Sequence, residues 1–262
     1  MAQFKMFPCI CFDCDSTLSV LEGIDELAKR AGREADIAPL TTAAMDGLIP
    51  IEEIYARRLE ILRPDREALR WLGQRYIDTQ VEGARAAVAA LQQAGRKVFV
   101  VSGGLKSPVV ALAARLGIAS DYVRAVDVYL DERGDYRGFE NESPLTRSDG
   151  KARIAAELAA EYGPVALVGD GVTDVAAQSG GAFVVGFGGV VRREAVVKGA
   201  NAFIEGPSLL DVSALILGVM PLRLSGYCTG FNMRARIVPG KSRMSSSTSS
   251  ASSTVPSASR TT

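Results

Sequence analysis

Histidine is absent from this 262-residue chain. Its absence excludes every histidine-dependent catalytic triad, zinc site and proton shuttle, so acid–base chemistry must rely on carboxylates, lysine, tyrosine or cysteine. An excess of charge is also missing, because 30 basic residues balance 30 acidic ones. Without net charge there is no general electrostatic attraction to nucleic acids or anionic membranes, and we expect neither as a partner.

Long apolar runs and targeting signals are missing as well. The longest apolar candidate, residues 209–222, is interrupted by Asp211 and is too short to span a bilayer. Residues 1–13 lack the charged start, long apolar core and cleavage site of a secretory signal. Three of the four cysteines fall within residues 9–14, in or beside an apolar run, which is typical of small buried residues in a reducing compartment. We therefore predict a cytoplasmic protein.

Short apolar runs alternate with amphipathic segments along most of the chain. The runs are nearly continuous, as expected for parallel strands covered on both faces; they are residues 9–13, 97–102, 164–170 and 182–187. The amphipathic segments between them end in glycine, which commonly terminates a helix. This alternation predicts an α/β fold with a doubly wound, mostly parallel, Rossmann-like sheet.

Three regions depart from this alternation. Residues 20–78 contain helical patterns and no clear strand, which predicts a helical cap inserted after the first strand. Residues 126–141 alternate around ERGD and predict a β-hairpin. The Ser/Thr-rich end cannot bury enough apolar surface to fold, so we expect disorder there. The predicted division is an α/β core (1–18 and 79–218), a helical cap (19–78) and a C-terminal extension (219–262).

Two aspartates, Asp13 and Asp15, end the first predicted strand. Crowded carboxylates repel one another unless a cation or a proton lies between them. Polar residues also lie at the ends of the second and third predicted strands and at the start of the intervening helix: Ser102, Gly103, Gly104, Asp170, Asp174 and Lys151. The carboxyl ends of strands at a switch point in the sheet order form a ligand crevice, so we expect these residues to converge.

These residue types together predict phosphoryl chemistry. Carboxylate oxygens suit Mg²⁺, and a serine hydroxyl, glycine amides and a lysine can hold phosphoryl oxygens. A carboxylate facing a phosphoryl group held in this way can act as a nucleophile and form an aspartyl-phosphate. Each motif alone also fits a turn or a capped helix, so the interpretation depends on all of them occurring together.

The four groups also resemble a known family. FDCDST (12–17), VVSGG (100–104), the lysine of DGKARIA (149–155) and GDGVTD (169–174) resemble, in order, the four motifs of the haloacid dehalogenase superfamily of phosphatases. Together with the hairpin ending in GF and the later GFGG, residues 5–218 are similar to the phosphoserine phosphatase family. This resemblance implies Mg²⁺-dependent hydrolysis of O-phospho-L-serine to L-serine and phosphate through an aspartyl-phosphate, the last step of serine biosynthesis.

The resemblance also implies a role for each matching residue. The implied nucleophile is Asp13 and the implied general acid and base is Asp15. The implied metal ligands are Asp13, Asp15 and Asp170, with Asp174 orienting the metal. The implied phosphate-binding residues are Ser102, Gly103, Lys151 and Thr173. The implied substrate-binding residues are Glu22, Arg58 and Met45. A guanidinium fork suits an α-carboxylate and a carboxylate suits an ammonium, which agrees with these roles. One departure is Ile51, where the family usually carries phenylalanine.

Two other functions fit the same motifs. One is a related small-molecule phosphomonoesterase or phosphotransferase of the same superfamily. The core motifs contact only the phosphate, so they do not distinguish the rest of the substrate. The other is a non-catalytic signalling switch phosphorylated on an aspartate, which also uses Mg²⁺, a lysine and a hydroxyl. Asp15 favours turnover over the switch, since a second carboxylate can activate water to hydrolyse the aspartyl-phosphate.

Overall fold

A parallel β-sheet forms the centre of the fold in the computed structural model, which describes residues 7–45 and 48–219. Within these residues the sheet has six strands in the order β3-β2-β1-β6-β7-β8, all parallel. The strands are β1 (Cys9–Phe12), β2 (Lys97–Leu105), β3 (Val123–Val126), β6 (Val165–Gly169), β7 (Phe183–Phe187) and β8 (Ala202–Ile204). This architecture confirms the predicted fold class.

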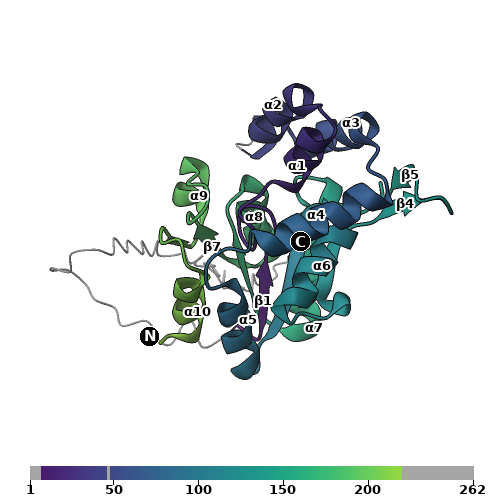
Figure 1. The fold of residues 1–262 in the computed structure, drawn as a ribbon. Helices are drawn as coiled ribbons and strands as arrows, with labels where there is room; N and C mark the ends of the chain where they lie inside the picture. The colour runs from purple at the N-terminus through teal and green to yellow at the C-terminus, as the bar shows by residue number, and fades with distance from the viewer. Residues whose placement is uncertain (1–6, 46–47, 220–262) are drawn as a thin grey trace, which may run out of the picture.

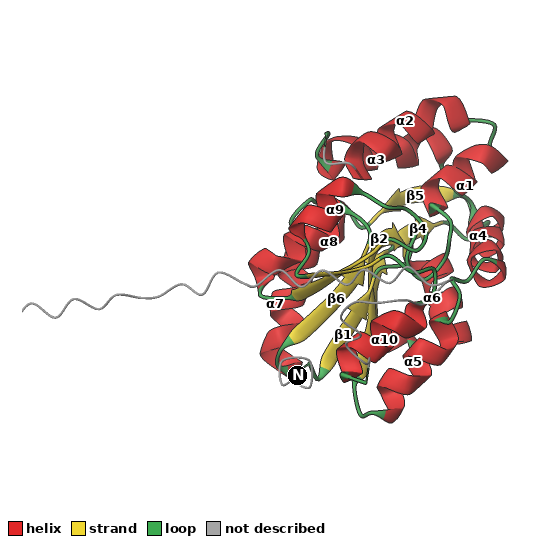
Figure 2. Ribbon diagram, turned by 90° about the vertical axis from the view of Figure 1, so that its left-hand side faces the viewer, coloured by secondary structure: helices red, strands yellow, loops and turns green. Residues whose placement is uncertain are grey.

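Helices cover both faces of the sheet. Figure 2 shows α7 and α8 on one side of the strands and α5 and α10 on the other. The helices outside the predicted cap are α5 (Ala84–Gln93), α6 (Lys106–Leu116), α7 (Gly150–Tyr162), α8 (Val172–Ala176), α9 (Glu194–Gly199) and α10 (Leu209–Leu217). Because both faces are covered, the strands are apolar along nearly their whole length, which explains their continuous hydrophobic runs.

The four predicted strands agree with β1, β2, β6 and β7 to within a few residues. Strands β3 and β8 were not expected from the sequence. These strands contain four and three residues and lie at the two edges of the sheet. Such short segments carry too few alternations to give a periodic signal.

Helices also fill the interval between β1 and β2. They are α1 (Gly23–Arg30), α2 (Glu34–Met45), α3 (Ile51–Leu62) and α4 (Arg66–Asp78). In Figures 1 and 2, α1, α2 and α3 lie beyond one end of the sheet. The α2 sequence contains Pro39 and has no clear apolar stripe, so this helix has little signature of its own. In the described ranges, no helix is long and apolar enough to cross a membrane.

The predicted hairpin is present as β4 (Val128–Leu130) and β5 (Tyr136–Phe139), which pair antiparallel in a separate two-stranded sheet. The Asp131 carboxylate closes its turn by accepting hydrogen bonds from the backbone amides of Gly134 and Asp135, at 3.0 and 2.9 Å. Asp–backbone bonds of this kind favour a tight turn. The expected disorder of the Ser/Thr-rich end falls on residues outside the described part.

The sheet order changes direction at β1. The chain leaves β1 for β2 on one side, and later β6 pairs with the other side of β1. This is the switch point at which ligands bind in open α/β sheets. Residues that follow β1, β2 and β6 therefore meet at one end of the sheet.

Candidate active site

Asp13 lies directly after the central strand β1. Its backbone N–H donates to the carbonyl oxygen of Val168 on β6 at 2.9 Å, so strand pairing fixes its position. One carboxylate oxygen accepts from the Cys14 amide at 2.8 Å, and the other lies 2.8 Å from Nζ of Lys151. The side chain is buried. Lys151 therefore supplies the positive charge that a buried carboxylate requires.

Lys151 is shared between two carboxylates. Its Nζ lies 2.6 Å from Asp174 as well as close to Asp13. Burial alone would lower the pKa of Lys151, but the negative charges of Asp13 and Asp174 outweigh burial and raise it. The lysine is therefore fully charged at neutral pH, and one cation partly neutralises a larger set of acids.

Asp15 is held by the predicted cap region. Its Oδ1 accepts hydrogen bonds from the Gly23 amide at 2.7 Å and from the Tyr76 hydroxyl at 2.6 Å. Burial, and then the charge of Asp13, raises the pKa of Asp15 to about 6. A carboxyl group with such a pKa can both give and take a proton near neutrality. Tyr76 was not expected at the site from the sequence, because a tyrosine on an amphipathic helix resembles an ordinary core residue.

Ser102 and two glycines end β2 beside this acid pair. The pairing of β2 with β3 shifts register between Val101 and Leu105, and Ser102 Oγ accepts from the Gly104 amide at 3.0 Å. A Cβ atom on Gly104 would lie 3.1 Å from a carboxylate oxygen of Asp15, which is closer than an ordinary van der Waals contact. Glycine thus lets this backbone approach the carboxylates closely.

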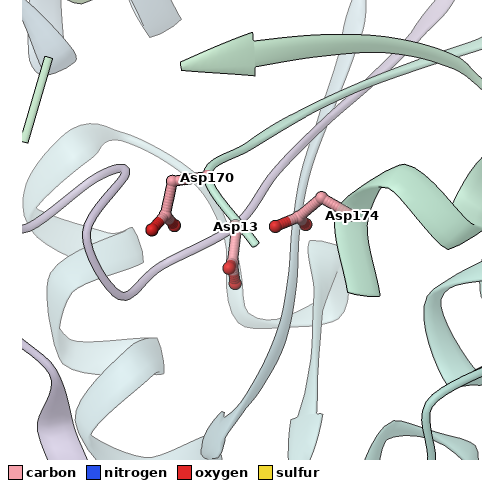
Figure 3. A group of neighbouring side chains, drawn as sticks. All are labelled: Asp13, Asp170 and Asp174. Atoms are coloured by element: carbon pink, nitrogen blue, oxygen red, sulfur yellow. The ribbon is translucent and has the colours of Figure 1, made fainter. Parts of the chain in front are cut away.

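Three aspartates converge where β1 and β6 end (Figure 3). Asp170 follows β6 and Asp174 lies on α8; each of them, like Asp13, brings one carboxylate oxygen into a group within 4.8 Å. Gly169 makes room for this group, since a Cβ there would lie 2.1 Å from the carboxyl carbon of Asp174. These buried oxygens form a cluster that could bind a metal ion.

The electrostatics of the cluster favour a cation. Burial, and then the charges of Asp174 and Asp13, raises the pKa of Asp170 to about 8. Burial is also the main cause that raises the pKa of Asp174 to about 6. Such shifts show that the ionised cluster is costly without added positive charge, and hard carboxylate oxygens suit a divalent ion such as Mg²⁺.

Arg58 lies on α3 and is only 6% exposed. Its Nη1 donates to Thr41 Oγ1 at 3.2 Å, whereas its Nε–H has no hydrogen-bond partner in the described structure. A buried guanidinium with an unpaired N–H is suited to receive an anion. The neighbouring Arg57 is exposed, so the structure distinguishes the two adjacent arginines.

Glu22 directly precedes α1 but makes no helix-capping bond with its side chain. Its carboxylate accepts from the Ser16 hydroxyl at 2.8 Å and forms an ion pair with Arg193 at 3.6 Å. Ser16 has a φ of 48°, an uncommon conformation for a residue other than glycine. The Ser16 hydroxyl and Arg193 thus hold the Glu22 carboxylate at the site.

One pocket joins most of the predicted residues. Its lining includes Asp13, Asp15, Glu22, Arg58, Ser102, Gly103, Lys151, Thr173 and Ile51. Asp170 and Asp174 are completely buried and do not line it. Met45 ends α2, and its side chain lies outside the described part. The lining also contains residues that the sequence analysis missed: Thr41, Tyr55, Tyr76 and Arg147.

Three cysteines lie in β1 or shortly after it. Cys9, Cys11 and Cys14 are free and buried, and among the described residues none belongs to the metal-sized cluster. Burial, followed by the charges of Asp15 and Asp13, raises the pKa of Cys14 well above its usual value. The expectation of buried core cysteines is confirmed, and Cys14 is not a reactive thiolate.

Comparisons with known proteins agree with this geometry. The family profile of haloacid dehalogenase-like hydrolases matches residues 7–178. A phosphoserine phosphatase of Rattus norvegicus is 35% identical over 197 residues, which covers 74% of this chain and 88% of that protein.

Two solved structures of phosphoserine phosphatase share the fold. One is a phospho-aspartyl intermediate analogue, with a TM-score of 0.67 and 28% identity, covering 79% of this chain and 97% of that one. The other is a substrate-bound complex, with a TM-score of 0.68 and 28% identity, covering 78% of this chain and 95% of that one. The chain therefore belongs to the haloacid dehalogenase-like hydrolases and, among them, to the phosphoserine phosphatase family.

Proposed function

We propose that the protein hydrolyses O-phospho-L-serine to L-serine and phosphate, the last step of serine biosynthesis. The observation that carries this proposal is a single pocket with two chemically different parts. One part holds Asp13 and Lys151, which suit a phosphoryl group. The other holds the partly exposed Glu22 and the buried Arg58, which suit the ammonium and carboxylate of an amino acid. The names of the relatives support the same substrate.

The phosphoryl group would bind between Asp13 and its donors. The donors that we assign to it are Lys151, the Ser102 hydroxyl, the Gly103 amide and the Thr173 hydroxyl. A carboxylate oxygen of Asp13 attacks phosphorus, and the bond from phosphorus to the serine oxygen breaks. The leaving oxygen takes the proton of Asp15, which gives free serine and an aspartyl-phosphate.

The second half of the reaction reverses the role of Asp15. The ionised carboxylate takes a proton from a water molecule, whose oxygen attacks the phosphorus of the aspartyl-phosphate. The bond from phosphorus to the Asp13 oxygen breaks, which releases phosphate and restores both aspartates. The hydrogen bonds from Tyr76 and Gly23 hold the Asp15 carboxylate in place for both proton transfers.

Mg²⁺ is the proposed cofactor, because the buried cluster of three aspartates has the donor set and the charge that fit it. The carboxylates of Asp13 and Asp170 and the backbone carbonyl of Asp15 would hold the ion, with Asp174 orienting the site. When bound, Mg²⁺ would offset the negative charge of the carboxylates and of the phosphoryl oxygens.

Metal removal should change how stability depends on pH. The raised pKa values of Asp170 (about 8) and Asp174 (about 6) mean that the folded, metal-free protein binds protons that the unfolded chain releases. Stability in EDTA should therefore increase as the pH falls from 8 to 6. Mg²⁺ should raise the melting temperature more at pH 8 than at pH 6. Thermal unfolding at both pH values, with and without Mg²⁺, measures this; a melting temperature in EDTA that falls on acidification contradicts it.

The predicted cap, residues 19–78, would select the substrate, while residues 1–18 and 79–218 would carry the chemistry. The α3 helix carries Arg58 to the pocket, and its Tyr55 hydroxyl donates to the Gly103 carbonyl at 2.8 Å. This bond joins the helix that carries Arg58 to the phosphate-binding end of β2. Ile51, on the first turn of α3, closes the same pocket.

A panel of phosphomonoesters tests the proposed function. Phosphate release should be fastest with O-phospho-L-serine, slower with its D-enantiomer and O-phosphothreonine, and slowest with sugar phosphates, and EDTA should abolish it. Similar activity on every member of the panel would support the proposed mechanism but contradict the proposed specificity. The substrate would then be a broader class of phosphomonoester. Absence of phosphate release, together with stable phosphorylation of Asp13, would instead favour the signalling switch.

We also propose that the protein acts in the cytoplasm. The three described cysteines are free and buried, as is usual for proteins of reducing compartments.

A further inference from the structure

Arg193 reaches the site from the loop between β7 and α9. Its side chain is 12% exposed, its Nε lies 3.2 Å from Oδ2 of Asp170, and its Nη2 lies 3.6 Å from Oε1 of Glu22. The other Asp170 oxygen accepts from the Thr17 hydroxyl at 3.3 Å. The side chain of the preceding Arg192 is 45% exposed and pairs with two acids at the surface, Glu194 and Glu205. Two adjacent arginines thus have very different environments.

The two acids that Arg193 contacts have separate tasks in the proposed function. Asp170 belongs to the metal-binding cluster, and Glu22 would read the ammonium of the substrate. They come from distant parts of the chain, after β6 and before α1. A guanidinium has several donors in one rigid plane, so a single arginine can serve two carboxylates at once.

We propose that Arg193 is a positioning residue that joins the amine-reading Glu22 to the metal-binding Asp170, and thereby sets amine selectivity and metal affinity together. The inference rests on the function proposed above and extends it to a residue without a role there. Arg193 acts through the two carboxylates and not on the reacting atoms.

The effect on amine recognition follows from the surroundings of Glu22. Its carboxylate is mostly buried and lies near two other acids, Asp15 and Asp170, which together with burial raise its pKa, while Arg193 opposes that rise. Without Arg193 the Glu22 carboxylate loses the contact that fixes its position, and we expect this loss to outweigh the relief of charge repulsion between Arg193 and the substrate ammonium. It would then bind the substrate ammonium less well.

The effect on the metal has the opposite sign. The positive charge of Arg193 lies within 3.2 Å of an oxygen of Asp170, so it repels a divalent cation held by the same carboxylate. Removing that charge should strengthen Mg²⁺ binding. A residue with a purely structural role would weaken both functions together when it is replaced.

The test compares Arg193→Gln and Arg193→Lys with the matched control Arg192→Gln. The first readout is the ratio of kcat/KM for O-phospho-L-serine to that for 3-phosphooxypropanoate, the same molecule without its ammonium. The second readout is the Mg²⁺ dissociation constant of the substrate-free protein, measured by calorimetry. Each variant is also combined with Glu22→Gln, because two residues that act together should give non-additive effects.

Arg193→Gln should reduce the selectivity ratio about tenfold, within the range measured for contacting charged residues. It should tighten Mg²⁺ binding by roughly threefold or more. Arg193→Lys keeps the charge and should retain the wild-type Mg²⁺ affinity, but it should recover only part of the selectivity because an ammonium lacks the planar fork. In the Glu22→Gln background, Arg193→Gln should cause no further change in the selectivity ratio. The control Arg192→Gln should match the wild type in both the selectivity ratio and the Mg²⁺ dissociation constant.

An unchanged selectivity ratio, or weaker Mg²⁺ binding, in a folded Arg193→Gln protein would overturn the inference. So would equal losses on both substrates with unchanged Mg²⁺ affinity, because Arg193 would then act on neither Glu22 nor Asp170. If the wild-type protein fails to hydrolyse O-phospho-L-serine, the proposed function fails instead. The Mg²⁺ titration then still decides whether Arg193 acts on Asp170.

Discussion

Replacing Asp13 by asparagine should reduce phosphate release from O-phospho-L-serine by about 10⁴-fold or more, the scale of loss seen when a catalytic nucleophile is removed. The amide cannot attack phosphorus, so no aspartyl-phosphate can form. The fold should persist, because the backbone bond to Val168 does not depend on the side chain and Lys151 keeps Asp174 as a partner. Steady-state phosphate release and thermal unfolding measure the two effects.

Asp78→Asn is the matched control for this variant. Asp78 is an exposed aspartate at the end of α4, and its carboxylate accepts a hydrogen bond from the side-chain amide of Gln74 at 2.8 Å. This control should retain wild-type activity. The Asp13→Asn protein should melt within a few degrees of the wild type, which corresponds to about 1 kcal/mol for a domain of this size. Appreciable activity in a pure Asp13→Asn protein would show that another group is the nucleophile.

Asp15→Asn should lower turnover by about 10²- to 10⁴-fold, the usual contribution of general acid–base catalysis. The asparagine oxygen can still accept the hydrogen bonds of Tyr76 and Gly23, so the position of the side chain should be preserved. The variant loses both the acid of the first step and the base of the second. Because water is a weaker nucleophile than the Asp13 carboxylate, we expect the second step to be slowed more, so the aspartyl-phosphate on Asp13 should accumulate. Acid-quenched protein should then carry one phosphoryl group, measured by intact mass.

The wild-type protein, quenched in the same way, should carry much less phosphoryl group at steady state. The double variant Asp13→Asn/Asp15→Asn should carry none, which assigns the modification to Asp13. If Asp15→Asn turns over at more than about a tenth of the wild-type rate, another group performs the proton transfers. The best-placed candidate among the described residues is the Tyr76 hydroxyl. Burial raises its pKa well above its usual value, so the hydroxyl stays protonated near neutral pH and cannot accept a proton from water.

The site residues differ in how well the sequence could reveal them. Asp13, Ser102, Lys151 and Asp170 stand at strand ends or a helix start, so their approach to one another follows from the order of elements alone. Tyr76 and Thr41 carry no such signal, since each lies inside a helix and its function depends on which neighbour it meets. Tyr76 meets Asp15 and Thr41 meets Arg58 only because the helices after β1 pack over the end of the sheet.

By itself, the sequence determined the strand and helix alternation, the inserted helices, the hairpin and the polar residues at the strand ends, because these depend on local periodicity and on spacing along one chain. Only the tertiary structure decided which of Arg57 and Arg58 is buried, that Glu22 turns from a helix start into the pocket, and that Arg193 bridges Glu22 and Asp170. The physical reason is that burial and charge pairing depend on contacts between segments far apart in sequence. No local pattern records those contacts.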